Sequence, residues 1–274
     1  MSVSETRLIQ LPSKKARLPR WLQLPLQWLA LPIIIVVAWS VISTITENQR
    51  FPPPAVIAQS FADNWLNGAF ITDVLPSLAR LGLSIVLAII IGIALGVLVG
   101  SNRWLRELLE PIFEFFRAVP PPMIVPLLVM VLGAGDTMKI AVITIGAMWP
   151  ILLNTIEGVR AVDSVQSETA RSFQLTGPER LFYITLPSAS PQIMAGIRQS
   201  LSVALILMVI SEMFLAQSGL GYKIEVFKQN YSFAAMWSII VLLGLVGVLL
   251  SVLFQIAERI VLNWYRGLKE AERA

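Results

Sequence analysis

Six long runs of apolar residues constrain what this chain can fold into more than any other feature. The runs cover residues 24–45, 81–100, 118–135, 140–156, 196–215 and 233–257, and the helix of the second is expected to begin near Ser77. A helix rises about 1.5 Å per residue, so about 20 apolar residues cross the ~30 Å hydrocarbon layer of a bilayer. The chain is 56% apolar and 14% charged, whereas soluble domains contain about 25% charged residues. We therefore expect an all-α membrane protein with six transmembrane helices.

The first apolar run has two interpretations, a transmembrane helix or a cleaved signal peptide. A polar and basic leader, residues 1–23, precedes it, and the run is longer than the usual hydrophobic region of a signal peptide. It also lacks a convincing cleavage site with small residues. We retain it as a helix. The expected organisation is then a basic N-terminal segment 1–23, a transmembrane domain 24–258 and a C-terminal tail 259–274.

The positions of the 21 Lys and Arg residues predict the orientation of the chain. Cytoplasmic loops of membrane proteins carry an excess of basic residues. Here most of them fall in the leader, in the loop after residue 100, in the long loop 157–195 and in the tail, which places both termini in the cytoplasm. The net charge of +4 is therefore explained by membrane topology. Membrane lipid, and no nucleic acid, is the expected surrounding partner.

The sequence contains no Cys and no His. This excludes disulfides, thiol catalysis, His-dependent catalysis and His metal sites. The phosphate-binding pattern G-x-x-x-x-G-K-[ST] is also missing. We expect a protein that is not an enzyme, holds no metal and binds no cofactor of its own.

The longest connection, residues 157–195, is predicted to form two short helices. Asp163 and Gln166 have the spacing of a capping box, and Thr176 and Glu179 repeat that spacing around a Gly-Pro pair. Pro187 is expected to end the second helix. From these residues alone, the segment fits equally well a docking helix for a partner protein and an amphipathic connector on the inner leaflet.

Two stretches of this loop form a longer pattern. They are Glu168-Thr169-Ala170-Arg171-Ser172-Phe173-Gln174 and Ile184-Thr185-Leu186-Pro187. The pattern resembles the EAA loop of bacterial ABC-importer permeases, which reads E-A-A, then a Gly six residues after the Glu, then I-x-L-P. Thr169 replaces the first Ala and Gln174 replaces the Gly, so Gly177 is expected to supply the turn instead.

Further stretches, in the same order along the chain, are similar to the nitrate/sulfonate/taurine group of these permeases, the binding-protein-dependent transport inner membrane components. They are Arg117-Ala118-Val119-Pro120, Pro126-Leu127, Gly133-Ala134-Gly135 with Lys139-Ile140, Asn154-Thr155 with Gly158, and Glu212 with Gly219-Leu220-Gly221-Tyr222. The resemblance covers roughly residues 51–259.

The resemblance implies a type I ABC-importer fold and a function in transport. As a homodimer in the bacterial inner membrane, the chain would form the pore for a small solute, such as a sulfonate, taurine or nitrate. A periplasmic or lipid-anchored binding protein would deliver this solute, which is expected to be an anion, and two cytoplasmic ATPase subunits would bind ATP and Mg. The residues implied to couple to the ATPases are Glu168, Thr169, Ala170, Phe173 and Gln174, with Gly177 in the turn and Ile184, Leu186 and Pro187 in the return to the membrane. The alternative is a subunit of an ion-coupled secondary transporter, which usually carries intramembrane acidic or His relays.

The glycines and the prolines inside the apolar runs can each be interpreted in two ways. Gly92, Gly96 and Gly100 recur on one helix face, which suits close helix packing or, less well, a substrate site. Pro120 and Pro126 lie in a Pro-rich run that suits a bendable, pore-lining segment, or else the entrance of a helix.

Ionisable residues in the apolar runs are also candidates. Glu212 is expected either to form an ion pair with Arg80 or another helix residue, or to belong to an outer gate on the substrate path. Arg80 and Arg117 are the cations best placed to meet an anionic solute.

Overall fold

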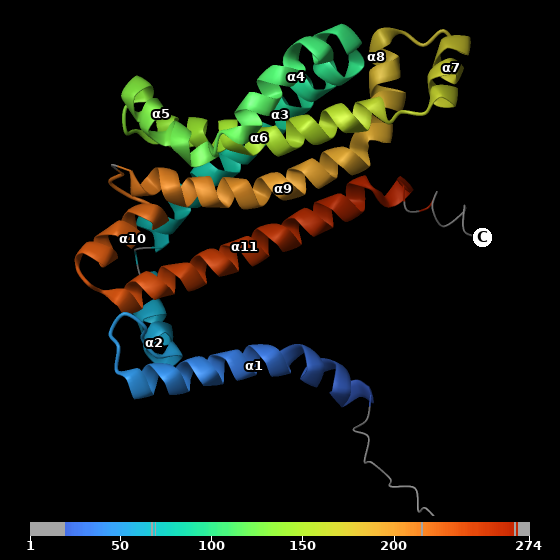
Figure 1. Ribbon diagram of the computed structural model, residues 1–274. Coiled ribbons are helices and arrows are strands. Elements are labelled where there is room, and N and C mark those ends of the chain that lie inside the picture. The colour runs from blue at the N-terminus through green and yellow to red at the C-terminus, as the bar shows by residue number, and fades with distance from the viewer. Residues whose placement is uncertain (1–19, 67, 69, 215, 266, 268–274) are drawn as a thin grey trace, which may run out of the picture. The chain divides into compact units, whose positions relative to one another are not determined.

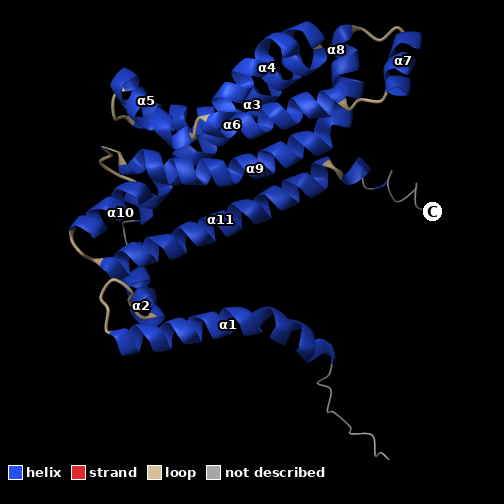
Figure 2. Cartoon of the chain, viewed as in Figure 1, coloured by secondary structure: helices blue, strands red, loops and turns tan. Residues whose placement is uncertain are grey.

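Every element in the described part of the computed structural model is a helix (Figure 1, Figure 2). The description covers residues 20–66, 68, 70–214, 216–265 and 267, and the side chains of residues 20–28 and 117 fall outside it. The chain divides after Val56 into two units. In the first unit, α1 (Arg20–Thr46) is followed by a short loop, and Trp39 of the helix stacks on Phe51 of the loop at a centroid distance of 5.2 Å.

The second unit contains the remaining helices, beginning within α2. In chain order, the elements are α2 (Pro54–Trp65), the π-helical turn η1 (Phe70–Val74), α3 (Leu75–Ser101), α4 (Arg103–Ala118), the 3-10 turn η2 (Pro121–Met123), α5 (Ile124–Leu132), α6 (Asp136–Arg160), α7 (Ser164–Ser172), α8 (Gly177–Arg180), the π-helical turn η3 (Leu181–Thr185), α9 (Leu186–Met213), α10 (Leu220–Gln229) and α11 (Phe233–Val261).

Five of the six expected spans are continuous helical stretches of sufficient length and hydropathy. They are Leu29–Thr46, Phe70–Ser101, Asp136–Arg160, Gly177–Met213 and Phe233–Val261. The sixth span exists only if α4 and α5 are counted together, because the pair is bent by 80° between Phe116 and Pro121. The expected all-α fold of long apolar helices is therefore confirmed, with one span broken.

The apolar run 118–135 is broken at its prolines, and their effect on the backbone explains where the break lies. A residue that precedes proline avoids the helical conformation. Val119 and Pro120 each precede a proline, and both have extended backbones, with ψ angles of 118° and 124°. Pro121 and Pro122 then lie in the first turn of the next helical segment, where a missing N–H costs little. The Pro-rich run is thus a helix entrance, while a role in lining the pore stays a proposal.

The core of the second unit lies where α6 packs between α3 and α9 (Figure 1). Gly92, Gly96 and Gly100 lie on the face of α3 that meets α6. A Cβ added to them would stand 2.9, 2.5 and 2.9 Å from the Cβ atoms of Ile151, Thr155 and Val159, respectively. Only small residues allow two helix backbones to approach this closely. The glycine face therefore packs α3 onto α6 within one chain.

Candidate functional site: the α7–α8 segment and a buried polar network

The α7–α8 segment, residues 161–185, carries seven of the nine residues that the resemblance implies for coupling to the ATPases. Asp163 caps α7, because its Oδ1 accepts the backbone N–H of Val165 at 2.8 Å. Gln166 contributes no described bond to this cap, so the first expected capping box is only half formed. Its Oε1 instead accepts the hydroxyl of Ser188 at 2.9 Å. This bond ties α7 to the beginning of α9.

The C-terminal end of α7 is a left-handed turn at Gln174. The N–H of Gln174 donates to the Arg171 carbonyl and the N–H of Leu175 to the Ala170 carbonyl, both at 3.0 Å, which is the Schellman arrangement. Gln174 has a φ of 52°, a conformation that glycine adopts freely and that costs other residues about 1–2 kcal/mol. The sharp turn therefore lies at the position of the EAA-pattern glycine. The expected turn at Gly177 is wrong, because Gly177 is the first residue of α8.

The helix that follows continues past its expected end. Thr176 and Glu179 form the second expected capping box, with the Thr176 N–H donating to Glu179 Oε2 at 2.8 Å. The expected stop at Pro187 is wrong, because α8 passes through η3 directly into α9. Pro187 lies in the first turn of α9, where proline is tolerated. The chain is therefore helical from Gly177 to Met213.

The surface of the α7–α8 segment combines exposed apolar and polar side chains. Phe173 is 76% exposed and Val165 66% exposed, whereas Ala170 is buried, at 1%. Of the other expected coupling residues, Glu168, Thr169, Gln174 and Gly177 are exposed, and Ile184, Leu186 and Pro187 are half-buried. An exposed aromatic ring among polar residues suits docking into a groove of a partner protein. Figure 1 shows α7 at one end of the unit, beyond the ends of α6 and α9.

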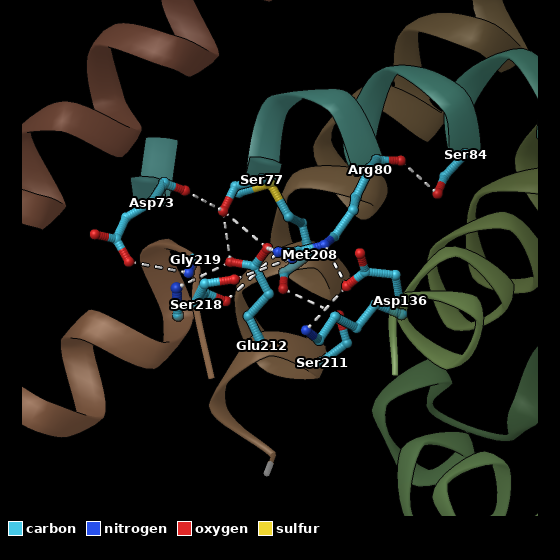
Figure 3. Close-up of polar contacts among 12 residues, drawn as sticks. Asp73, Ser77, Arg80, Ser84, Asp136, Met208, Ser211, Glu212, Ser218 and Gly219 are labelled. Atoms are coloured by element: carbon cyan, nitrogen blue, oxygen red, sulfur yellow. Dashed lines mark hydrogen bonds and ion pairs between the residues drawn. The ribbon is translucent and has the colours of Figure 1, made fainter. Parts of the chain in front are cut away.

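A buried polar network lies at the opposite end of α9, and it consists of Asp73, Ser77, Arg80, Asp136 and Glu212 (Figure 3). These residues come from η1, α3, α6 and α9, which are distant in sequence. Glu212 has no exposed surface, and Asp73, Ser77 and Arg80 are also buried. Asp136, whose side chain is 63% exposed, connects the network to the surface.

Glu212 is at the centre of the network. Its Oε1 lies 2.8 Å from Nη1 of Arg80, so the ion pair expected as one of two alternatives is present. The Ser77 hydroxyl lies 2.8 Å from both carboxylate oxygens, and the N–H of Gly221 donates to Oε2 at 3.1 Å. Gly219 has a φ of 119°, and a Cβ there would stand 2.5 Å from Glu212 Cδ. Glu212 therefore binds the first turn of α10, where backbone N–H groups favour a negative charge.

The guanidinium of Arg80 is held by two carboxylates. Besides Glu212, its Nε lies 2.9 Å from Oδ1 of Asp136, and its Nη2 donates to the Ser218 hydroxyl at 3.2 Å. Lys139 Nζ, which is itself buried, lies 3.4 Å from the same Asp136 oxygen. An open cavity of about 370 Å³ lies beside these groups, lined in part by Arg80, Asp136 and Lys139. The cations at this cavity are thus paired with carboxylates.

Asp73 connects η1 to the beginning of α10. Its Oδ1 accepts the N–H of Gly219 at 3.3 Å, and its Oδ2 lies 3.4 Å from Nζ of Lys223. Asp73 and Ser77 were not among the residues singled out from the sequence. The spacing Asp73, Ser77, Arg80 and Ser84, at intervals of three or four residues, is the signal that identifies one polar helix face in an otherwise apolar run.

Two comparisons with known proteins decide the family. The model of the family described as "Binding-protein-dependent transport system inner membrane component" matches residues 84–267, more than half of the chain. The chain belongs to this family. The permease is 30% identical to the putative aliphatic sulfonates transport permease protein SsuC of Bacillus subtilis (strain 168), over 86% of each chain. It is 26% identical to the taurine transport system permease protein TauC of Escherichia coli (strain K12), over 92% of this chain and 94% of that protein.

The fold of the permease is also that of a solved importer. The inward-facing MetNI methionine ABC transporter superposes with a TM-score of 0.60 and 21% identity, covering 69% of this chain and 94% of that chain. The permease is therefore a multi-pass membrane subunit of an ABC importer, and it is not an enzyme. Permeases of this family work with an ATPase and a substrate-binding protein.

The remaining expected site residues are placed as follows. Pro120 and Pro126 are exposed. The backbone of Arg117 is helical, at the end of α4, and its side chain lies outside the described residues. Among the described residues, no group of three or more His, Cys, Asp or Glu side chains could hold a metal ion.

Proposed function

We propose that the permease forms the translocation pore of an ATP-driven importer for a small organic or inorganic anion. It does so as a homodimer in the inner membrane, with both termini in the cytoplasm. Two separate ATPase subunits dock on the α7–α8 segment of the two copies, and an extracytoplasmic binding protein delivers the solute. The names of the relatives support the solute class, because they include sulfonate, taurine and bicarbonate permeases.

The observation that carries this proposal is the construction of the α7–α8 segment. An exposed Phe173 directly follows a short helix whose start is capped by Asp163 and whose end is closed by the turn at Gln174. The segment is also connected to α9, both by the hydrogen bond between Gln166 and Ser188 and by the uninterrupted helix that begins at Gly177. A partner that moves α7 therefore moves a membrane-spanning helix as well.

Disulfide cross-linking tests the docking, because the chain contains no Cys and every introduced thiol is unique. Phe173→Cys, combined with single Cys residues around the groove of the ATPase subunit, is expected to give a cross-linked heterodimer. Tyr231→Cys is the matched control, because Tyr231 is equally exposed at 76% but lies after α10. Equal cross-linking of both variants, or none from Phe173→Cys while the complex still transports, would reject the docking site.

Uptake into proteoliposomes tests the transport function. The permease, its ATPase and its binding protein are expected to accumulate taurine, an alkanesulfonate, nitrate or bicarbonate only when ATP is present. Replacing the phosphate-binding lysine of the ATPase is expected to abolish that uptake. Uptake by the permease alone, driven by a proton gradient, would instead establish the secondary transporter.

A further inference from the structure

A second cavity lies at the α7–α8 end of the unit, and the α7–α8 segment forms part of its wall. Its volume is about 740 Å³, and it opens between the C-terminal end of α3, the beginning of α4, the end of α6 and α8. This volume is within the range of small-molecule sites, about 300–1,000 Å³. One part of the wall is apolar and includes Val97, Leu98, Val159 and Leu181.

The charged part of the wall is entirely basic. Arg106, Arg160 and Arg180 line the cavity, and its lining contains no Asp or Glu. Arg160 has a carboxylate partner, since its Nη1 lies 2.9 Å from Glu157 Oε1. Arg180 donates to the Ser167 hydroxyl, at 3.3 Å. Within the described part of the chain, neither Arg106 nor Arg180 forms an ion pair.

We propose that this cavity binds the phosphate group of an anionic membrane phospholipid. Arginine is the side chain best suited to phosphate, because its planar guanidinium donates two parallel hydrogen bonds. Basic pockets between transmembrane helices bind acidic lipid headgroups, and the neighbouring apolar wall suits the acyl chains. The end of the spanning helix α3, at Gly100 and Ser101, lines the cavity and is where a headgroup would lie.

A free phosphate ion in solution would bind to the same arginines as the phosphate of a lipid. In either case the bound phosphate would connect the same elements. Arg106 belongs to α4, whereas Ser167 and Arg180 belong to the α7–α8 segment. A phosphate bound by both arginines therefore joins α4 to the segment proposed to dock the ATPase. The binding itself does not depend on that docking.

The test compares the thermal stability of the full-length chain in nanodiscs of phosphatidylcholine with and without phosphatidylglycerol. Arg106→Gln/Arg180→Gln is the test variant. Arg103→Gln/Arg259→Gln is the matched control. Both arginines are exposed and lie outside the cavity lining, and the two substitutions remove the same charge as those of the test variant. Phosphatidylglycerol is expected to stabilise the natural chain and the control. Loss of each cavity arginine is expected to weaken retention of phosphatidylglycerol, measured by native mass spectrometry, about tenfold.

A second arm and a second variant make the outcome decisive. Inorganic phosphate is titrated against the detergent-solubilised chain without added lipid. Stabilisation by phosphate and not by phosphatidylglycerol would overturn the lipid assignment in favour of a free phosphate. If Arg106→Gln/Arg180→Gln does not fold, Ser101→Asp introduces a negative charge at an exposed residue of the cavity lining and is expected to abolish lipid retention. Equal retention by the control and by the cavity variants would overturn the proposal.

Discussion

Gln174 is held in a backbone conformation that favours glycine, at φ 52° in the turn that ends α7. Gln174→Gly is expected to stabilise the permease by about 0.5–1 kcal/mol or to leave it unchanged, because relief of the strain is partly offset by the entropy of glycine. Gln174→Val is expected to destabilise the segment, because a branched side chain is poorly tolerated at positive φ. Thermal unfolding and uptake are measured together. Higher activity and stability of the valine variant would contradict this account of the turn.

Glu212 and Arg80 illustrate the cost of leaving a charge without its partner inside the protein. Glu212→Leu leaves Arg80 with Asp136 as its remaining carboxylate partner and leaves the N–H of Gly221 without its acceptor. We expect a loss of about 3–5 kcal/mol, seen as poor accumulation and a lower unfolding temperature. The double variant Arg80→Met/Glu212→Leu is expected to recover part of that loss. If the double variant loses as much stability as the single variants Arg80→Met and Glu212→Leu together, the ion pair does not couple these residues.

The partners in this network could be predicted only in part. An ion pair for Glu212 follows from the cost of a charge in an apolar run, and Arg80 was one named partner. Asp136 was not predicted, because nothing in the sequence brings the beginning of α6 next to α3. Ser77 was not predicted as a partner either, because a hydroxyl in a long apolar helix can satisfy itself on its own backbone. In the structure it does so with the Asp73 carbonyl, at 3.1 Å, and contacts Glu212 as well.

At the scale of the helices, the packing of α3 on α6 gives a controlled prediction. Gly96→Val adds a side chain whose Cβ would stand 2.5 Å from Thr155, so the helices must separate. Gly82→Val makes the same change in the same helix, where nothing lies within 4 Å of the added Cβ. We expect Gly96→Val to lower the unfolding temperature and the uptake strongly, with a cost of about 1–3 kcal/mol, and Gly82→Val to be nearly neutral. Equal losses for the two variants would mean that helix propensity, and not packing, is responsible.

The helices that the sequence predicted well are those in which length and hydropathy decide the outcome. α6 and α11 match the expected runs closely, because about 20 apolar residues leave a chain little alternative in a bilayer. The run at 118–135 is not one continuous helix, because three consecutive prolines, visible in the sequence, interrupt it. The predicted helix end at Pro187 is wrong for another reason: the π-helical turn η3 before it joins α8 to α9 without a break. The π-helical turn η3 has no signal in the sequence, so the continuity of α8 with α9 could not be predicted.

At the scale of the whole molecule, the proposed orientation places the α7–α8 segment and the loop after α10 on opposite sides of the membrane. In intact spheroplasts, a membrane-impermeant maleimide is expected to label Tyr231→Cys and to leave Phe173→Cys unlabelled. After permeabilisation, both should react, since the two side chains are equally exposed. The reverse order of labelling would invert the topology and rule out an ATPase on α7.

The continuity of α9 has a mechanical consequence. Its 28 residues form a rod of about 42 Å, with Ser188 attached to α7 at one end and Glu212 attached to α3 and α10 at the other. Near its middle, Gly196 lies so close to α6 that an added Cβ would stand 2.7 Å from the Pro150 carbonyl oxygen. If α9 tilts as a rigid helix, we expect it to pivot at this contact with α6. A tilt of about 5° moves its two ends by about 2 Å in opposite directions. A displacement of α7 would then shift the Glu212 end of α9 in the opposite direction.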